Sequence, residues 1–250
     1  MLHDGPGRVR AIRRGPASLY ALCGAAVTTA RVATAQLPAL PSAQSAFPAP
    51  GLAVALDAGH GDGRSVGALA AATGVRRLQL TAAVGLPGAL ADYERRGISA
   101  GARLAARLYR TPRLGVSAFA GYGFERMQEN FSYPAGTTTA STAPSPQPTG
   151  RFTQIPVGLS AGVRGLLGER PYAISLAPMY NYSRWAISDS VRTRSGARLA
   201  ALAELAVTPK IGVGAAVEFG GGGPLGSPYA ARRTVVGAGI SYALHRVVAR

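Results

Sequence analysis

The stretch GISAGARLAARLY, from Gly97 to Tyr109, alternates along its whole length between two kinds of side chain. Ile98, Leu104, Leu108 and the alanines between them occupy one set of alternate positions, and glycine, serine, arginine and Tyr109 dominate the other. A period of two places successive side chains on opposite faces of a β-strand, whereas a helix repeats every 3.6 residues. This stretch therefore predicts a strand with one apolar face and one face of mainly small and charged residues.

The same alternation continues from about residue 51 to the end and defines ten candidate strands. They are 51–60, 66–74, 77–86, 97–109, 113–126, 152–165, 171–186, 196–208, 211–220 and 232–245. The first two are weak and rich in alanine, so an eight-strand count stays open if residues 51–74 plug or flank the sheet. Pro156 and Pro178 lack the N–H group that a fully paired strand donates, so each predicts a bulge or a shorter strand.

The connections between these strands are expected to alternate in length. Short ones follow the even-numbered strands, as at Thr111-Pro112 and Thr208-Pro209, and longer ones follow the odd-numbered strands. The longest spans about 127–151 and is too polar and proline-rich to pack. Short turns at one rim and long loops at the other are typical of transmembrane β-barrels, and an even strand number returns both termini to the short-turn rim.

The two faces of the strands differ in a way that favours a barrel over a soluble sandwich. The less apolar face is mostly Gly, Ser and Ala with isolated charges, which suits the narrow interior of a barrel of eight or ten strands. Buried charges need partners, so an interior ion-pair network is one hypothesis and solvated strand ends are the alternative. The candidate charges are Arg103, Arg107, Arg164, Arg198, Glu204 and Glu218.

Aromatic residues on the apolar face form two expected belts, as in membrane barrels. Those near the long-loop rim are Tyr122, Phe124, Tyr180, Tyr182 and Phe219, and those near the short-turn rim are Tyr172 and Tyr242. The sequence therefore predicts an all-β fold, a closed antiparallel up-and-down transmembrane β-barrel of about ten strands over 51–250. Its apolar face is expected to point outward into lipid.

The N-terminal region differs from the rest of the chain. Residues 1–35 carry a basic segment, an apolar run and then Ala33-Thr34-Ala35, the layout of a secretory signal peptide, with a disordered basic tail as the alternative. Cys23, the single cysteine, lies in this region without the preceding small residue of a lipoprotein site. Residues 36–50, rich in Pro, Ala and Ser, are expected to form a linker. No later apolar run reaches the length of a spanning helix.

The formal net charge of +16 does not indicate nucleic-acid binding. Lys210 is the only lysine, and the arginines are scattered through strands and turns without a stripe or a nucleic-acid motif. Arginines in loops are instead suited to bidentate pairing with the phosphates of an anionic outer leaflet.

The region 51–250 resembles the small β-barrel proteins of the bacterial outer membrane. In the last strand, Gly239, Tyr242 and Leu244 are similar to the family's C-terminal assembly signal, whereas the tail from His245 to Arg250 departs from the terminal aromatic of many members. The resemblance implies export through the periplasm, insertion by the barrel-assembly machinery, and outer-membrane lipid and lipopolysaccharide as partners.

No catalytic, cofactor-binding or metal site and no cofactor is predicted. His60 with Asp57 or Asp62 is the one candidate for a metal or acid–base pair, but two ligands fall far short of a coordination shell. A turn explains the neighbouring glycines more simply. No serine has an evident histidine partner, because His60 and His245 are expected at opposite rims.

The predicted function is therefore that of a non-enzymatic outer-membrane barrel with a structural, adhesive or weak small-solute pore role. One alternative is a barrel enzyme that acts on lipid through the loop around His60 or through polar groups inside the strands. A second alternative is a soluble lipocalin-like carrier.

Overall fold

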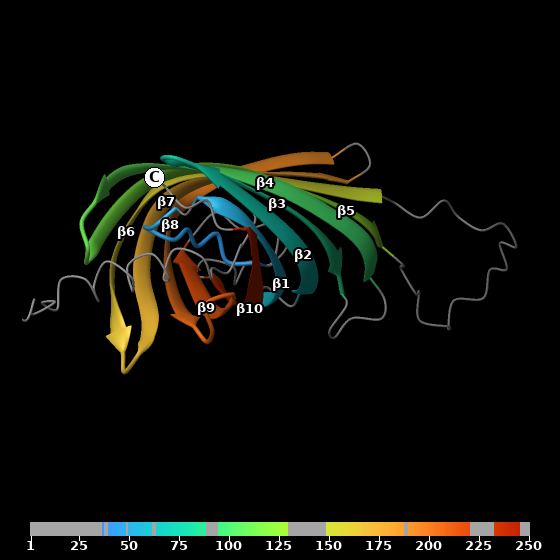
Figure 1. Cartoon of the computed structure of the whole chain (residues 1–250). Coiled ribbons are helices and arrows are strands. Elements are labelled where there is room, and N and C mark those ends of the chain that lie inside the picture. Colours follow the sequence, from blue (N-terminus) through green and yellow to red (C-terminus); the bar gives the residue numbers. More distant parts are fainter. Residues whose placement is uncertain are drawn as a thin grey trace, which may run out of the picture.

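The alternating segments pair edge to edge around a complete ring in a computed structural model of the chain (Figure 1). The structure describes residues 37, 40–48, 50–61, 64–88, 95–129, 149–187, 190–220 and 233–245. The strands are β1 Gly51–Gly61, β2 Arg64–Val75, β3 Leu78–Pro87, β4 Arg95–Arg110, β5 Leu114–Glu129, β6 Thr149–Leu167, β7 Arg170–Ile187, β8 Ser190–Ala206, β9 Ile211–Gly220 and β10 Arg233–His245.

Every strand pairs antiparallel with its neighbours in sequence, and β1 pairs with β10 to close the barrel. The predicted fold class, a closed ten-strand up-and-down barrel, is confirmed. The eight-strand alternative is wrong, because residues 51–75 form β1 and β2 in the wall. The expected signal peptide, the tail after His245, Asp62 and most of the loop 127–151 lie outside the described residues.

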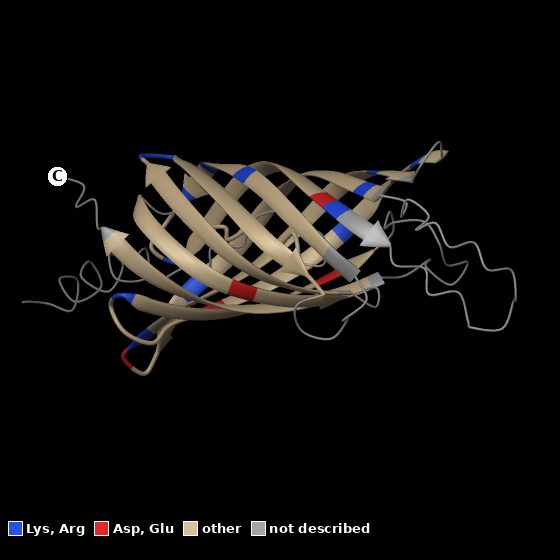
Figure 2. Cartoon of the chain, turned by 90° about the vertical axis from the view of Figure 1, so that its right-hand side faces the viewer, with Lys and Arg blue, Asp and Glu red and all other residues tan. Residues whose placement is uncertain are grey.

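The apolar side chains point away from the barrel axis, as the alternation predicts. On β4, Leu104 is 50% exposed while its neighbour Arg103 is 2% exposed. Figure 2 shows a wall with few charged residues, set in isolated patches. The apolar side chains on its outside do not meet those of a second sheet, so a sandwich is excluded. An apolar surface of this extent is stable in contact with lipid.

The predicted aromatic orientation is confirmed. Tyr122, Tyr180, Tyr182, Phe219 and Tyr242 are exposed on the outer face, and Phe124 and Tyr172 are half-buried. Tyr122 and Tyr180 lie near the middle of β5 and β7, so they are farther from the long-loop rim than predicted. The described residues contain no helix with the length and apolarity needed to cross a membrane.

The prolines interrupt pairing differently from the prediction of a bulge or a shorter strand. The β5–β6 ladder skips the position of Pro156, and the β6–β7 ladder skips that of Pro178, but the register on either side is unchanged. Both strands are long, at 19 and 18 residues. The missing N–H groups therefore cost local ladder bonds only, because the paired residues on both sides hold the register.

A bulge lies instead in β4, where the β4–β5 register shifts between Arg107 and Tyr109. Tyr109 is expected on the other face of the strand from Leu108. Both side chains are exposed on the outside, because the extra residue of the bulge reverses the alternation.

Two of the connections expected to be longer are short. Only residues 62–63 join β1 to β2, and only residues 188–189 join β7 to β8. In β8 the apolar alternation that supported the prediction begins only near residue 196. The pairing of β7 with β8 nevertheless continues beyond it, up to Ile187 and Ser190. Pairing persists because backbone hydrogen bonds need no apolar face once the strands have left the lipid. The longer connections join β3–β4, β5–β6 and β9–β10.

A charge on the outer face is expected to destabilise the barrel. Leu104 lies near the middle of β4 on the outer face. Leu104→Arg is expected to lower the free energy of unfolding in lipid vesicles by about 2–4 kcal/mol, because a cation at the bilayer midplane is poorly solvated. Urea titration measures the change, with Leu104→Met as control. Equal stability of the two variants would contradict an outer face in lipid.

Candidate functional site

The lumen of the barrel holds the segment that precedes β1. Leu37 and residues 40–48 are buried, and Figure 1 shows this blue trace inside the ring of strands. We call residues 37–48 the inner segment. Residues 36–50 are predicted to form a linker, and the described part of this stretch packs against the inner wall.

The inner segment runs along the barrel from one rim to the other. Leu37 lies beside Gly85 and Val66, near the long-loop ends of β3 and β2. Phe47 lies beside Gly115, near the short-turn end of β5. The chain then enters β1 at the short-turn rim, so the segment spans most of the height of the lumen.

Serines of the inner wall fix the backbone of the inner segment. They come from β5, β6 and β7, three neighbouring strands, and the segment also reaches a carboxylate on β8. The hydrogen bonds are Ser117 Oγ to the Ser45 carbonyl at 3.1 Å, Ser160 Oγ to the Gln44 carbonyl at 2.6 Å, the Ala46 N–H to Ser175 Oγ at 3.0 Å, and Ser45 Oγ to Glu204 Oε2 at 2.7 Å. A segment without secondary structure thereby satisfies backbone groups that would be costly to bury unpaired.

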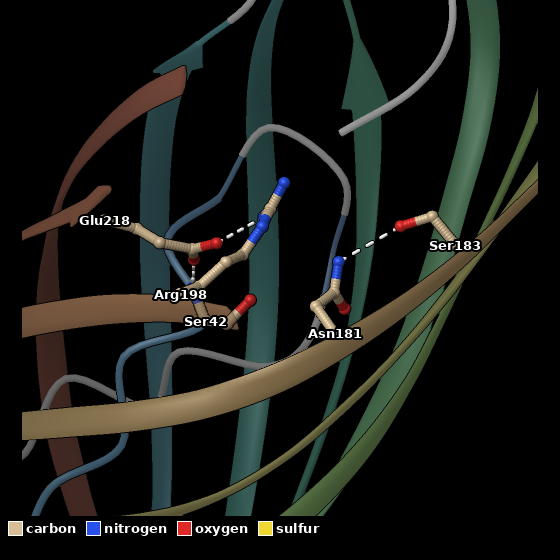
Figure 3. Close-up of polar contacts among 5 residues, drawn as sticks. All are labelled: Ser42, Asn181, Ser183, Arg198 and Glu218. Carbon is tan, nitrogen blue, oxygen red and sulfur yellow. Dashed lines mark hydrogen bonds and ion pairs between the residues drawn. The ribbon is translucent and has the colours of Figure 1, made fainter. Parts of the chain in front are cut away.

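A buried ion pair holds the middle of the segment. The side chains of Arg198 and Glu218, which are 7% and 2% exposed, form a salt bridge across β8 and β9. Glu218 Oε2 also accepts a hydrogen bond from the Ser42 N–H, as Figure 3 shows. On the wall nearby, Asn181 Nδ2 donates to Ser183 Oγ at 3.0 Å.

Arg103 binds the segment from the opposite side of the lumen. Its guanidinium donates to the Ala43 carbonyl and to Gln44 Oε1, and it lies 5.8 Å from the centre of the Phe119 ring. Arg103 and Glu218 therefore contact consecutive residues of the segment from different strands.

The six charges predicted to form an interior network divide into two groups. Arg103, Arg198, Glu204 and Glu218 form an ion pair with one another or hydrogen bonds with the inner segment. Arg164 and Arg107 instead donate to backbone carbonyls at the short-turn rim, Arg164 to Pro112 and Arg107 to Arg76. The guanidinium of Arg164 also lies 5.2 Å from the Phe47 ring centre, so it covers the end of the inner segment.

Glycines of the wall provide the space that the segment fills. A Cβ atom at Gly115 would lie 2.6 Å from Cε1 of Phe47, and one at Gly237 would lie 2.7 Å from Cδ of Pro41. Real Cβ atoms do not approach carbon so closely, so any larger side chain at either position would displace the segment. The wall and the segment are thus complementary in shape as well as in hydrogen bonding.

The histidine candidate does not form a site with Asp57. His60 is exposed on the outer face, whereas Asp57 is buried in the lumen, because the two residues are an odd number of positions apart on one strand. His60 pairs with Val236 and His245 pairs with Leu52, which places the two histidines at opposite rims. Within the described residues, no group of three His, Cys, Asp or Glu is placed to hold a metal ion.

Sequence reasoning missed the inner segment as a functional feature. Leu37, Leu40 and Phe47 are large apolar residues in a stretch otherwise typical of a linker, and they were the available signal. Fold and lumen together define the class: a closed, outward-apolar β-barrel with a segment of its own chain packed inside.

No protein-family model matches the chain, and no curated protein matches it. Among solved structures, it is similar to the translocator domain of the autotransporter NalP from Neisseria meningitidis, with a TM-score of 0.43, 12% identity, and coverage of 78% of this chain and 88% of that one. It is also similar to Neisserial surface protein A, with a TM-score of 0.36, 17% identity and coverage of 78% and 98%. A third is the outer membrane protease OmpT from Escherichia coli, with a TM-score of 0.35, 10% identity and coverage of 77% and 95%. At these values the similarities carry no argument about activity.

Proposed function

We propose that this protein is a non-enzymatic barrel of the bacterial outer membrane, with a structural or adhesive role. We further propose that the inner segment keeps its lumen closed to passive flow of small solutes. The observation that carries this proposal is the occupied lumen, in which residues 40–48 are buried. In a water-filled pore, these residues would be exposed to solvent.

The membrane location is supported by the outer face. Leucine, valine, isoleucine and aromatic side chains cover it from β1 to β10, and a soluble barrel would present this surface to water at a large cost. The leader pattern of residues 1–35 and the resemblance of the last strand to an assembly signal favour the bacterial outer membrane as the destination.

The two alternative functions have less support. For the lipid-acting enzyme, the one named candidate residue is His60, whose side chain lies on the opposite face of β1 from Asp57. A lipocalin-like carrier needs a polar exterior and a ligand cavity, whereas this barrel is apolar outside and holds its own inner segment. A non-enzymatic membrane barrel is consistent with both the apolar outer face and the occupied lumen.

The proposal is tested by electrical recording on the full chain. The refolded protein is expected to migrate faster unheated than heated on a gel, as folded barrels do, and to show no steady ion-conducting steps in planar bilayers. Cell fractionation is expected to recover it with the outer membrane. Steady conductance of the wild-type chain, or its recovery as a soluble periplasmic monomer, would overturn the proposal.

A further inference from the structure

Three arginines lie together on the outside of the barrel near the long-loop rim. Arg126 on β5, Arg151 on β6 and Arg184 on β7 are all exposed. Arg126 is directly opposite Arg151 in the β5–β6 ladder. Arg184 is opposite Thr153, which makes it the diagonal neighbour of Arg151. Opposite residues have Cβ atoms about 5 Å apart and diagonal ones about 7–8 Å, so the three guanidinium groups can converge on one ligand.

These three charges have no counter-charge from the described chain. No described residue that points outward from β5, β6 or β7 is an Asp or Glu, and Glu125, next to Arg126, points into the lumen. None of the three arginine side chains makes a hydrogen bond or ion pair with the described part of the protein. Like charges placed directly opposite one another are unfavourable in a sheet, so the arrangement favours an external anion.

The height of the three arginines on the wall indicates which anion this is. Arg126 follows Phe124 on the outer face, and Arg184 follows Tyr182, each one step closer to the long-loop rim. Interfacial aromatic rings mark the level of the lipid headgroups. The arginines therefore lie immediately above the apolar band, where a lipid carries its phosphates.

We propose that Arg126, Arg151 and Arg184 form a binding site for the phosphates of an outer-leaflet lipid of the lipid A type. Each guanidinium presents a planar fork that matches two phosphate oxygens, and arginine suits a partly dehydrated interface better than lysine does. The site rests on the membrane location in the proposed function, but not on the closed lumen.

The test measures lipid retention by native mass spectrometry on the refolded full chain in neutral detergent. The probes are lipid A with both phosphates, lipid A from which the phosphates have been removed, and inorganic phosphate. Wild type is compared with the triple variant Arg126→Gln, Arg151→Gln and Arg184→Gln. The matched control is Arg77→Gln, Arg113→Gln and Arg170→Gln, which removes three exposed arginines at the short-turn rim. Gel migration before and after heating verifies that each variant is folded.

Wild type and control are expected to retain phosphorylated lipid A. The triple variant is expected to bind it on the order of 100-fold more weakly, because each of the three arginines contributes a similar factor to the affinity for an anionic lipid. Arg151→Lys keeps the charge but loses the planar guanidinium that can pair with two phosphate oxygens. Its affinity for lipid A is expected to lie between those of the wild type and the triple variant. Equal binding by the triple variant, an equal loss in the control, or equal retention of dephosphorylated lipid A would overturn the site. Inorganic phosphate bound as tightly as lipid A would also overturn it. These outcomes leave the conductance and fractionation results, which test the proposed function, unaffected.

Discussion

Glu218→Leu is expected to destabilise the barrel by about 3–5 kcal/mol, because it leaves the buried guanidinium of Arg198 without its carboxylate. The same substitution removes the acceptor of the Ser42 N–H. Urea unfolding followed by the fluorescence of Trp185, the single tryptophan of the chain, measures the loss.

Two controls separate the buried pair from a general effect of removing charge. Glu169→Leu makes the same change at an exposed turn residue and is expected to alter stability by less than about 0.5 kcal/mol. The double variant Arg198→Met with Glu218→Leu replaces both charges with apolar groups and is expected to recover most of the loss. If the single and double variants were equally unstable, charge burial would not be the cause.

Replacing residues 37–48 with a glycine- and serine-rich segment of the same length is expected to turn a closed barrel into a conducting one. The replacement removes Leu37, Pro41 and Phe47, the side chains that fit against wall glycines. Without them the lumen would be lined by serines and by the charges of Arg103 and Glu218, which water readily hydrates. Planar-bilayer recording is expected to show discrete ion-conducting steps that the wild type lacks.

An engineered disulfide provides the opposite control. An ideal Cβ atom at Gly162 lies 3.0 Å from Cβ of Ala46. Disulfides need about 3.5–4.5 Å between these atoms, so the segment must move slightly away from the wall. The wall must also adjust, because the same Cβ atom would lie 2.5 Å from the Ile174 carbonyl oxygen. Ala46→Cys with Gly162→Cys is expected to cross-link on oxidation and to stay non-conducting. A closed lumen after the glycine- and serine-rich replacement, or ion-conducting steps from the cross-linked variant, would contradict the role of the inner segment.

The period-two pattern was sufficient to predict the strands and the direction of each face. The run from Gly97 to Tyr109 lies in β4, with Leu104 outside and Arg103 inside. Alternation is a local property, since adjacent residues of a strand must face opposite sides, so it can be read without knowing the partner strands. The pattern failed at two places. At the bulge before Tyr109 an extra residue reverses the alternation, and in β8 the residues from Ser190 to about 196 pair without alternating apolar residues.

The sequence by itself determined strands with one apolar face and one face of small residues, because neighbouring residues of a strand point to opposite sides. It left eight and ten strands open, and the pairing of β1 and β2 within the wall decided for ten. Only the tertiary structure decided what fills the lumen. The contact between Ser42 and Glu218 joins residues 176 positions apart, and no local pattern encodes it. Leu37, Pro41 and Phe47 become core residues because closing the wall encloses a space that the small side chains of its inner face leave open.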